Sequence, residues 1–225
     1  MKKYLLTIVL LCLSFITLAQ NDVTKFLGIP VDGTKAEVIR QLKEKGFTST
    51  IFDPEILQGE FNGTPVHIFI ATTNNKVSRI MIADKNSVDE TDIKIRFNTL
   101  CNQFANNARY ISPNEDPRIP EEENISYGLI VHNKRYEAIF YQQPTIDTIA
   151  MAKDIETRVS SQFTEAELSN PTDEIKNKLQ DIALSYAMDI LFKKPVWFTI
   201  SQRGNRYYIS MYYDNEYNRA NGEDL

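Results

Sequence analysis

The sequence predicts an α+β fold in which an antiparallel sheet of hairpins carries helices on one face. Short segments with alternating apolar residues are separated by turn pairs such as Asn62-Gly63 and Asn74-Asn75. Segments with helical periodicity lie between these groups, and no glycine-rich strand-to-helix turn of a parallel nucleotide-binding fold is present. We therefore expect a helix-plus-meander unit that is repeated along the chain.

Residues 1–19 have the layout of a secretory signal peptide. Lys2 and Lys3 precede an apolar run over residues 5–18, and the run ends in small residues up to Ala19. The run is too short for a transmembrane anchor, and no later segment is long and apolar enough to span a membrane. We expect cleavage after Ala19 and a periplasmic or secreted protein.

The mature chain, residues 20–225, is expected to form a single domain with possible sub-units 20–86, 87–143 and 144–225. In the first sub-unit, Thr34 and Glu37 have the spacing of a capping box, and Gly46 is a typical helix stop. The pattern predicts a helix over residues 34–46. Three strands are expected after it, over residues 56–61, 65–71 and 77–83.

The second sub-unit is predicted to contain a helix and a hairpin. Ser87 and Glu90 again have capping-box spacing, and the apolar stripe continues to about residue 107. Residues 111–124 contain three prolines and five acidic residues, which predicts a mobile loop. Strands are expected over residues 125–131 and 135–142.

The third sub-unit is predicted to contain two helices and a last hairpin. The first helix covers residues 147–162 with its apolar side facing inward, and a polar link over residues 164–170 follows. Asn170 and Pro171 have the pattern of an N-cap and a first helical residue. The last two strands are expected over residues 196–201 and 206–213, around a turn at Gly204-Asn205.

Charge and cysteine content exclude several classes of function. Removal of Lys2 and Lys3 leaves 23 of the 25 basic residues against 30 acidic ones, a net charge of −7. Because an acidic protein gains little from phosphate contacts, we do not expect a nucleic-acid partner. Cys101 is the one cysteine of the mature chain, so no internal disulfide forms.

We expect no catalytic residue, metal site or cofactor. His67 and His132 are the only histidines, and neither has a second ligand at metal-binding spacing. No G-x-S-x-G motif is present, and Cys101 lies in the middle of a helix, where a thiol packs as a small apolar group.

Two polar patterns leave alternatives open. The acids of residues 111–124 can bind a cation or a basic partner, but such a run is more often a solvated loop. These acids are Glu115, Asp116, Glu121, Glu122 and Glu123. Asp147-Thr148-Ile149 matches a short O-glycan acceptor pattern of some gut bacteria, and it also fits a helix start.

The tail after Tyr213 is rich in acids and amides, but it does not fit an EF-hand loop. Counted from Asp214, the positions that need glycine and glutamate hold Arg219 and Leu225. We interpret the tail as a strand end and a turn, with Tyr212, Tyr213 and Tyr217 as its packing anchors.

The aromatic residues of the last hairpin are the candidate binding residues. Strand alternation places Tyr208 and Tyr212 on one face, and Tyr207 and Tyr213 on the other. If helices cover only one face, then tyrosines and Trp197 remain on the open face, where such rings commonly anchor partners. The alternative is that they pack under the acidic loop or the tail.

Four segments resemble a group of uncharacterised exported proteins of Gram-negative gut bacteria. They are FLGIPVDGT at residues 26–34, LKEKGF at 42–47, GEFNG at 59–63 and the tail at 212–225. This resemblance implies export but no activity. The expected topology is also similar to that of β-lactamase inhibitory protein and of small outer-membrane assembly lipoproteins, which implies binding of another protein across a sheet.

The sequence thus favours an exported, non-catalytic protein that binds a partner, which we expect to be another protein. The expected binding surface is an open aromatic face of the sheet that includes Trp197, Tyr208 and Tyr212. A carbohydrate-binding accessory module is the first alternative. A hydrolase that uses two carboxylates is the second, and it requires two acids that converge in one pocket.

Overall fold

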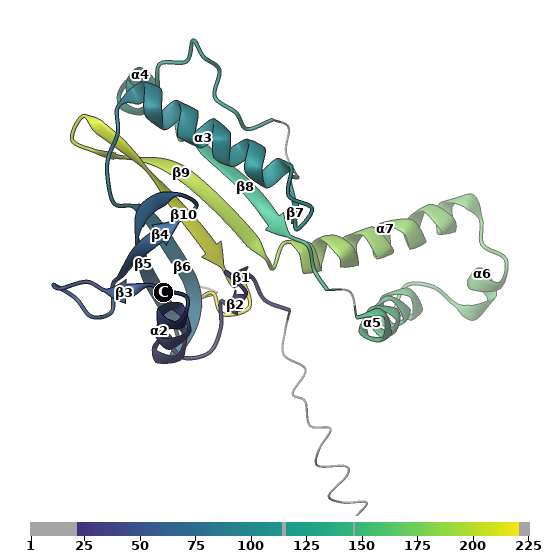
Figure 1. The fold of residues 1–225 in the computed structure, drawn as a ribbon. Helices are drawn as coiled ribbons and strands as arrows, with labels where there is room; N and C mark the ends of the chain where they lie inside the picture. The colour runs from purple at the N-terminus through teal and green to yellow at the C-terminus, as the bar shows by residue number, and fades with distance from the viewer. Residues whose placement is uncertain (1–21, 114–115, 146, 221–225) are drawn as a thin grey trace, which may run out of the picture.

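The computed structural model describes residues 22–113, 116–145 and 147–220 (Figure 1). The predicted signal peptide and its cleavage point lie outside these residues. Within the described part of the chain, no helix has the length and apolar character needed to cross a membrane.

A single eight-stranded sheet organises the fold, and every pairing within it is antiparallel. Its strand order is β3-β4-β5-β6-β10-β9-β8-β7. This sheet confirms the predicted α+β class. The strands are β3 (Thr48–Ser49), β4 (Leu57–Phe61), β5 (Thr64–Thr73), β6 (Lys76–Asp84), β7 (Tyr110–Ile111), β8 (Glu137–Gln142), β9 (Pro195–Arg203) and β10 (Arg206–Asp214), and β1 (Lys25–Phe26) and β2 (Ile29–Pro30) form a separate small sheet.

Each half of the large sheet follows a helix. Helix α2 (Lys35–Glu44) precedes β4, β5 and β6, and helix α3 (Glu90–Ala105) precedes β8, β9 and β10. The halves join through their last strands, because β6 pairs with β10 and Met81 lies opposite Tyr212. The C-terminal hairpin therefore lies in the middle of the sheet (Figure 1).

Helices α2 and α3 cover the same face of the sheet, which we call the helix face. The buried side chains of the strands and of these two helices form one continuous apolar cluster. At its centre, the ring of Phe198 lies 5.0 Å from Phe97 and 6.1 Å from Phe140, measured between centroids. Phe104 completes this cluster and stacks on Phe140 at 4.9 Å.

The tight turns of the first meander are confirmed. Asn62 and Gly63 have φ values of 51° and 72°, and Asn74 and Asn75 have 49° and 62°. Two successive residues with positive φ match the right-handed twist of the flanking strands, which explains the use of asparagine and glycine there.

Residues 125–131 form helix α4 (Ile125–Val131), so the strand predicted there is wrong. The side chain of Asn124 caps the helix by accepting a hydrogen bond from the N–H of Tyr127. The Glu90 carboxylate also accepts from the N–H groups of Ile125 and Ser126, at 2.7 and 3.3 Å. These contacts satisfy N–H groups of the first turn, which have no partner within the helix, and so stabilise the helical start. Glu90 is thus not part of a capping box with Ser87, and Asp89 caps α3 instead.

The third block forms a helical arm that consists of α5 (Thr148–Ser160), α6 (Glu165–Ser169) and α7 (Asp173–Leu191). The arm connects β8 to β9 along the chain and extends away from the sheet (Figure 1). Helix α5 has no buried residue and Ile149 is exposed, so the predicted inward apolar side is wrong. Helices α5 and α7 pack on each other, and neither has a comparably extensive contact with a strand of the sheet.

Two helix starts in the arm differ from the prediction. The expected polar link contains α6, which begins with a capping box of Thr164 and Glu167. Helix α7 begins after Thr172, whose side chain accepts from the N–H of Ile175, so Asn170 is not its N-cap. A single turn of helix is too short to produce a clear periodic pattern in the sequence.

The segment expected as a mobile loop is anchored to α3 in its described part. The side chain of Asn98 bonds both backbone groups of Ile119 at 2.8 Å, and Ile119 is buried. The Lys94 ammonium donates to the backbone carbonyls of Glu121 and Glu123, at 2.5 and 2.7 Å. These contacts hold the segment along the helix.

Cys101 is buried in α3, and we expect its thiol to be unreactive in the folded protein. Burial, and secondarily the nearby Asp116 carboxylate, raise the pKa of Cys101 from 9.0 to about 12. Native protein at pH 8 should therefore resist iodoacetamide, and protein in 6 M guanidinium should be alkylated, as measured by mass spectrometry. The raised pKa of Cys101 also makes the free energy of unfolding depend on pH. Because only the unfolded thiol ionises near pH 9, the contribution of the protonated Cys101 to this free energy is complete below that pH and is lost as the pH rises toward 12. Rapid alkylation of the native protein would contradict this placement.

Candidate functional site

The face of the sheet opposite α2 and α3, which we call the open face, carries a row of apolar side chains across five neighbouring strands. Direct strand pairings connect consecutive members of this row. Each member is partly exposed. The apolar row consists of Phe69, Met81, Tyr212, Trp197 and Ile139.

Trp197 and Tyr212 form the centre of the apolar row. Their rings stack with centroids 4.0 Å apart and an interplanar angle of 15°. The guanidinium of Arg79 lies 5.0 Å from the Tyr212 ring and 5.6 Å from the Trp197 ring. The three side chains thus form a compact aromatic and cationic group.

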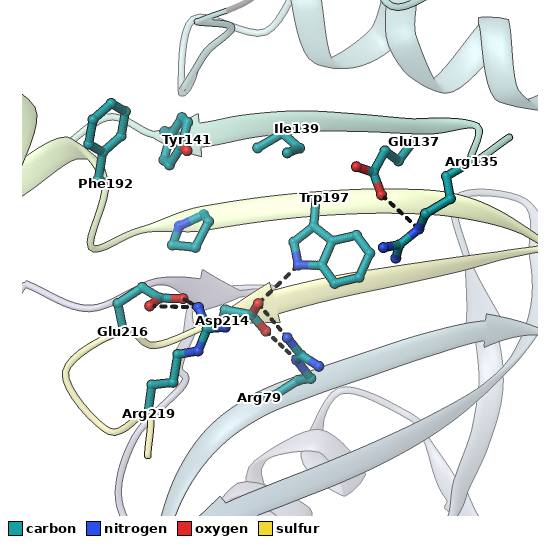
Figure 2. Close-up of a pocket in the computed structure, with 11 residues that line it drawn as sticks. Arg79, Arg135, Glu137, Ile139, Tyr141, Phe192, Trp197, Asp214, Glu216 and Arg219 are labelled. Carbon is teal, nitrogen blue, oxygen red and sulfur yellow. Dashed lines mark hydrogen bonds and ion pairs between the residues drawn. The ribbon is translucent and has the colours of Figure 1, made fainter. Parts of the chain in front are cut away.

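Asp214 fixes this group from the end of β10. Its carboxylate accepts two hydrogen bonds from Arg79, from Nε at 2.6 Å and from Nη2 at 2.8 Å. It also accepts one from the indole Nε1 of Trp197 at 2.9 Å (Figure 2). The hydrogen bond to Asp214 raises the pKa of Arg79, although burial partly opposes the shift. These charge-assisted hydrogen bonds fix the orientation of the indole in the folded chain.

A pocket of about 410 Å³ lies on the open face beside Trp197, and we call it the face pocket (Figure 2). Tyr141 of β8 and Phe192, which follows α7, lie at one end with ring centroids 5.1 Å apart. Ile139, Pro195 and Trp197 also line the pocket, together with six charged side chains. The charged side chains are Arg79, Arg135 and Arg219 together with Glu137, Asp214 and Glu216.

The structure brings together two of the three predicted binding residues. Trp197 and Tyr212 are in ring contact, whereas Tyr208 lies farther along β10 beside Arg203, whose guanidinium is 4.9 Å from its ring. The predicted alternation is confirmed, because Tyr207 and Tyr213 are buried on the helix face. Tyr208 does not line the face pocket.

Thr148, the predicted modification site, is exposed at the start of α5 and lies on the helical arm. The preceding Asp147 is the N-cap, and its side chain accepts from the N–H groups of Ile149 and Ala150. The helix-start interpretation is therefore confirmed, and glycosylation of Thr148 stays a prediction.

The beginning of the tail is a packed turn, as predicted, but its anchors are amides rather than Tyr217. The side chain of Asn215 is buried and donates to the carbonyl of Val31 at 2.7 Å. Asn218 donates to Asp32 and to the carbonyl of Val77, each at 2.8 Å. Residues 221–225 of the tail lie outside the described residues.

The described residues contain no group of three or more histidine, cysteine, aspartate or glutamate side chains placed to hold a metal ion. Burial, and secondarily Lys85 and Arg203, lower the pKa of His67 on the open face. In the acidic segment, Asp116 pairs with Arg118, and Glu123 pairs with Lys134. Glu115 lies outside the described part of the chain.

Arg79, Asp214, Tyr141 and Phe192 were not among the predicted site residues. Arg79 and Asp214 are 135 positions apart, and only the pairing of β6 with β10 brings them together. The alternation of residues along β8 could have identified Tyr141 as a site residue, since it places Ile139 and Tyr141 on the face opposite Phe140.

No protein-family model matches the chain, and neither the curated proteins nor the solved structures contain a significant match. The resemblance to exported proteins thus stays a prediction, and the functional argument rests on the geometry of the open face.

Proposed function

We propose that this chain is an exported, non-catalytic binding protein that holds a protein partner on the open face of its sheet. The observation that carries the proposal is the Trp197–Tyr212 stack, which Asp214 and Arg79 fix in place and which stays partly exposed. The layout of residues 1–19 supports export.

The chemistry of the apolar row suits protein recognition. Tryptophan, tyrosine and arginine are the residues most enriched among those that dominate the binding energy of protein interfaces. Because hydrogen bonds to Asp214 already orient Trp197 and Arg79, binding loses less side-chain entropy than it would with free rotamers.

The edges of the sheet favour binding on the face over addition of a strand. The outermost strands, β3 and β7, contain two residues each. Short edge strands offer few backbone groups to an incoming strand. The open face is by contrast a continuous surface across five strands.

We expect Trp197→Ala and Tyr212→Ala to weaken partner binding by at least about 2 kcal/mol, or roughly 30-fold. The partner is first captured by chemical cross-linking to the tagged mature protein in the exported fraction of its source cells and identified by mass spectrometry. Its affinity for the purified wild type and each variant is then measured by biolayer interferometry.

Tyr127→Ala is the matched control, because Tyr127 is exposed on α4 and lies outside the apolar row. This control should retain wild-type affinity, and circular dichroism should show that all variants are folded. Equal affinities for the wild type, Trp197→Ala and Tyr212→Ala would remove the open face as the binding surface.

A carbohydrate ligand is the second candidate, and the face pocket is the observation that favours it. Its volume of about 410 Å³ lies within the usual range for small-ligand sites, and it combines aromatic rings with hydrogen-bonding groups. A glycan array with wild type and Trp197→Ala separates the two candidates, because only a lectin loses a defined glycan signal in the variant.

The geometry gives less support to a carboxylate-dependent hydrolase. Glu137, Asp214 and Glu216 line one pocket, but each forms an ion pair with an arginine. A nearby positive charge favours the ionised form of a carboxylate, whereas a general acid must keep its proton.

A further inference from the structure

We propose that the face pocket receives a basic side chain, lysine or arginine, from the protein partner. This inference rests on the proposed function and specifies the chemistry of the contact. Three features of the pocket carry it: the depth of its charges, the weakness of two of its ion pairs, and its aromatic walls.

The acidic groups lie deeper than the basic groups with which they pair. The side chains of Asp214, Glu216 and Glu137 are 8%, 21% and 36% exposed. Their partners Arg79, Arg219 and Arg135 are 39%, 69% and 72% exposed. A guest that enters the pocket therefore meets carboxylates toward the interior, with the arginines at the rim.

Two of the three ion pairs are easily exchanged. Arg219 contacts Glu216 at 3.2 Å, and Arg135 contacts Glu137 at 3.6 Å, with both arginines largely exposed. Exposed pairs of this kind contribute about 0–1 kcal/mol. A guest cation can thus replace either arginine, which then extends into water without loss of its hydration.

The walls of the pocket suit a cation. Trp197, Tyr141 and Phe192 place aromatic rings along the pocket, and the faces of such rings attract ammonium and guanidinium groups. The protein already shows this mode of binding internally, since the Arg79 guanidinium lies against Trp197 and Tyr212 while Asp214 holds it. The guest cation would bind in the same way, against the aromatic rings of the pocket and with Glu216 as its carboxylate partner.

An anionic guest fits less well, because the more buried carboxylates would repel it and cannot turn outward as the arginines can. The net charge, −5 for the full sequence and −7 for the expected mature chain, also favours the approach of a basic partner segment. A neutral saccharide is the remaining alternative, and a pocket that binds one should not prefer an arginine peptide to a citrulline peptide.

The test uses the emission of Trp197, the only tryptophan of the chain, as a reporter inside the pocket. Blocked tripeptides of the form Gly-X-Gly are titrated into the folded protein, with X as arginine, lysine, citrulline or glutamate. We expect a saturable change of emission with arginine and lysine that weakens at high salt. Citrulline retains the shape of arginine without its charge, so it should bind at least about fivefold more weakly.

Two substitutions on one ion pair should shift this affinity in opposite directions. Glu216→Gln removes the acceptor charge and should weaken the arginine peptide about threefold, whereas Arg219→Gln removes the competing cation and should strengthen it by a similar factor. Glu44→Gln is the matched control, because Glu44 pairs with Arg40 on α2 and should change nothing.

Equal binding of arginine and citrulline peptides, preference for the glutamate peptide, or absence of any emission change would each overturn the inference. Reversed effects of Glu216→Gln and Arg219→Gln would overturn it as well. The proposed function fails separately, through unchanged partner affinity in Trp197→Ala. If Trp197→Ala loses the partner while Glu216→Gln binds it and the peptides as the wild type does, the open face stands and the basic guest is rejected.

Discussion

Phe198→Ala is expected to lower the free energy of unfolding by about 3–5 kcal/mol, the largest effect of any substitution considered. Phe198 is fully buried at the centre of the helix face. Its ring contacts those of Phe97, Phe104 and Phe140, at centroid distances of 5.0, 5.7 and 6.1 Å. Alanine would leave a cavity that these rigid rings fill only partly. Urea unfolding, followed by circular dichroism, measures the loss.

Phe52→Ala is the control for this substitution, because Phe52 is almost fully exposed. The same change of side chain there should alter the free energy of unfolding by less than about 0.5 kcal/mol. Similar losses in the two variants would contradict the central position of Phe198 in the core.

Arg96→Met should destabilise the protein by about 3 kcal/mol. Arg96 donates two hydrogen bonds of 2.6 Å to the carboxylate of Asp84, which is buried where β6 ends. The variant would leave this carboxylate with the N–H of Ile209, at 3.2 Å, as its remaining donor. A buried charge without its partner costs far more than the pair itself contributes.

Two comparisons test whether the expected loss of stability arises from the burial of the Arg96–Asp84 pair rather than from the ion pair itself. Arg40 and Glu44 also approach to 2.6 Å, but both are exposed, so Arg40→Met should cost less than about 1 kcal/mol. In an Arg96→Met background, Asp84→Asn removes the unpaired charge and should recover part of the lost stability. Urea unfolding measures the stability of the double variant. If its loss equals the sum of the losses in the two single variants, Arg96→Met does not leave an unpaired charge at Asp84, and the explanation is wrong.

Local signals in the sequence were sufficient for β4, β5 and β6, although they did not predict the two-residue strand β3. The turn residues between β4, β5 and β6 have side chains that tolerate positive φ, and the strands alternate with a period of two. The N-cap at Thr34 and the buried position of Cys101 follow from equally local patterns. In each case the interaction that decides the structure lies within a few residues.

The predictions failed where a distant group decides the structure. Residues 125–131 alternate well enough for a strand, but the Glu90 carboxylate, 35 positions away, accepts hydrogen bonds from the first turn of α4. The apolar residues of α5 follow a helical period, yet their partner is α7 rather than the sheet. A single sequence does not specify which of several apolar surfaces a helix will meet.

The candidate site was predictable only in part for the same reason. Alternation within β10 correctly separated Tyr212 from Tyr213. The contact of Asp214 with Arg79 depends on the register of β10 against β6, which no local pattern contains. From the sequence, Asp214 was therefore interpreted only as part of a strand end and a turn, although it organises the candidate site.

The central position of β10 also sets the order in which the chain can acquire its structure. Ser210 pairs with Ala83, so the join between the two halves of the sheet forms across more than half of the polypeptide. During synthesis this join has to wait until β10 (Arg206–Asp214) has been made, and closing so long a loop is slow. A newly made chain would thus stay incompletely folded until residues 206–214 can pair with β6. Premature termination before residue 206 would leave β6 as an unpaired edge, which is a target for proteolysis or aggregation.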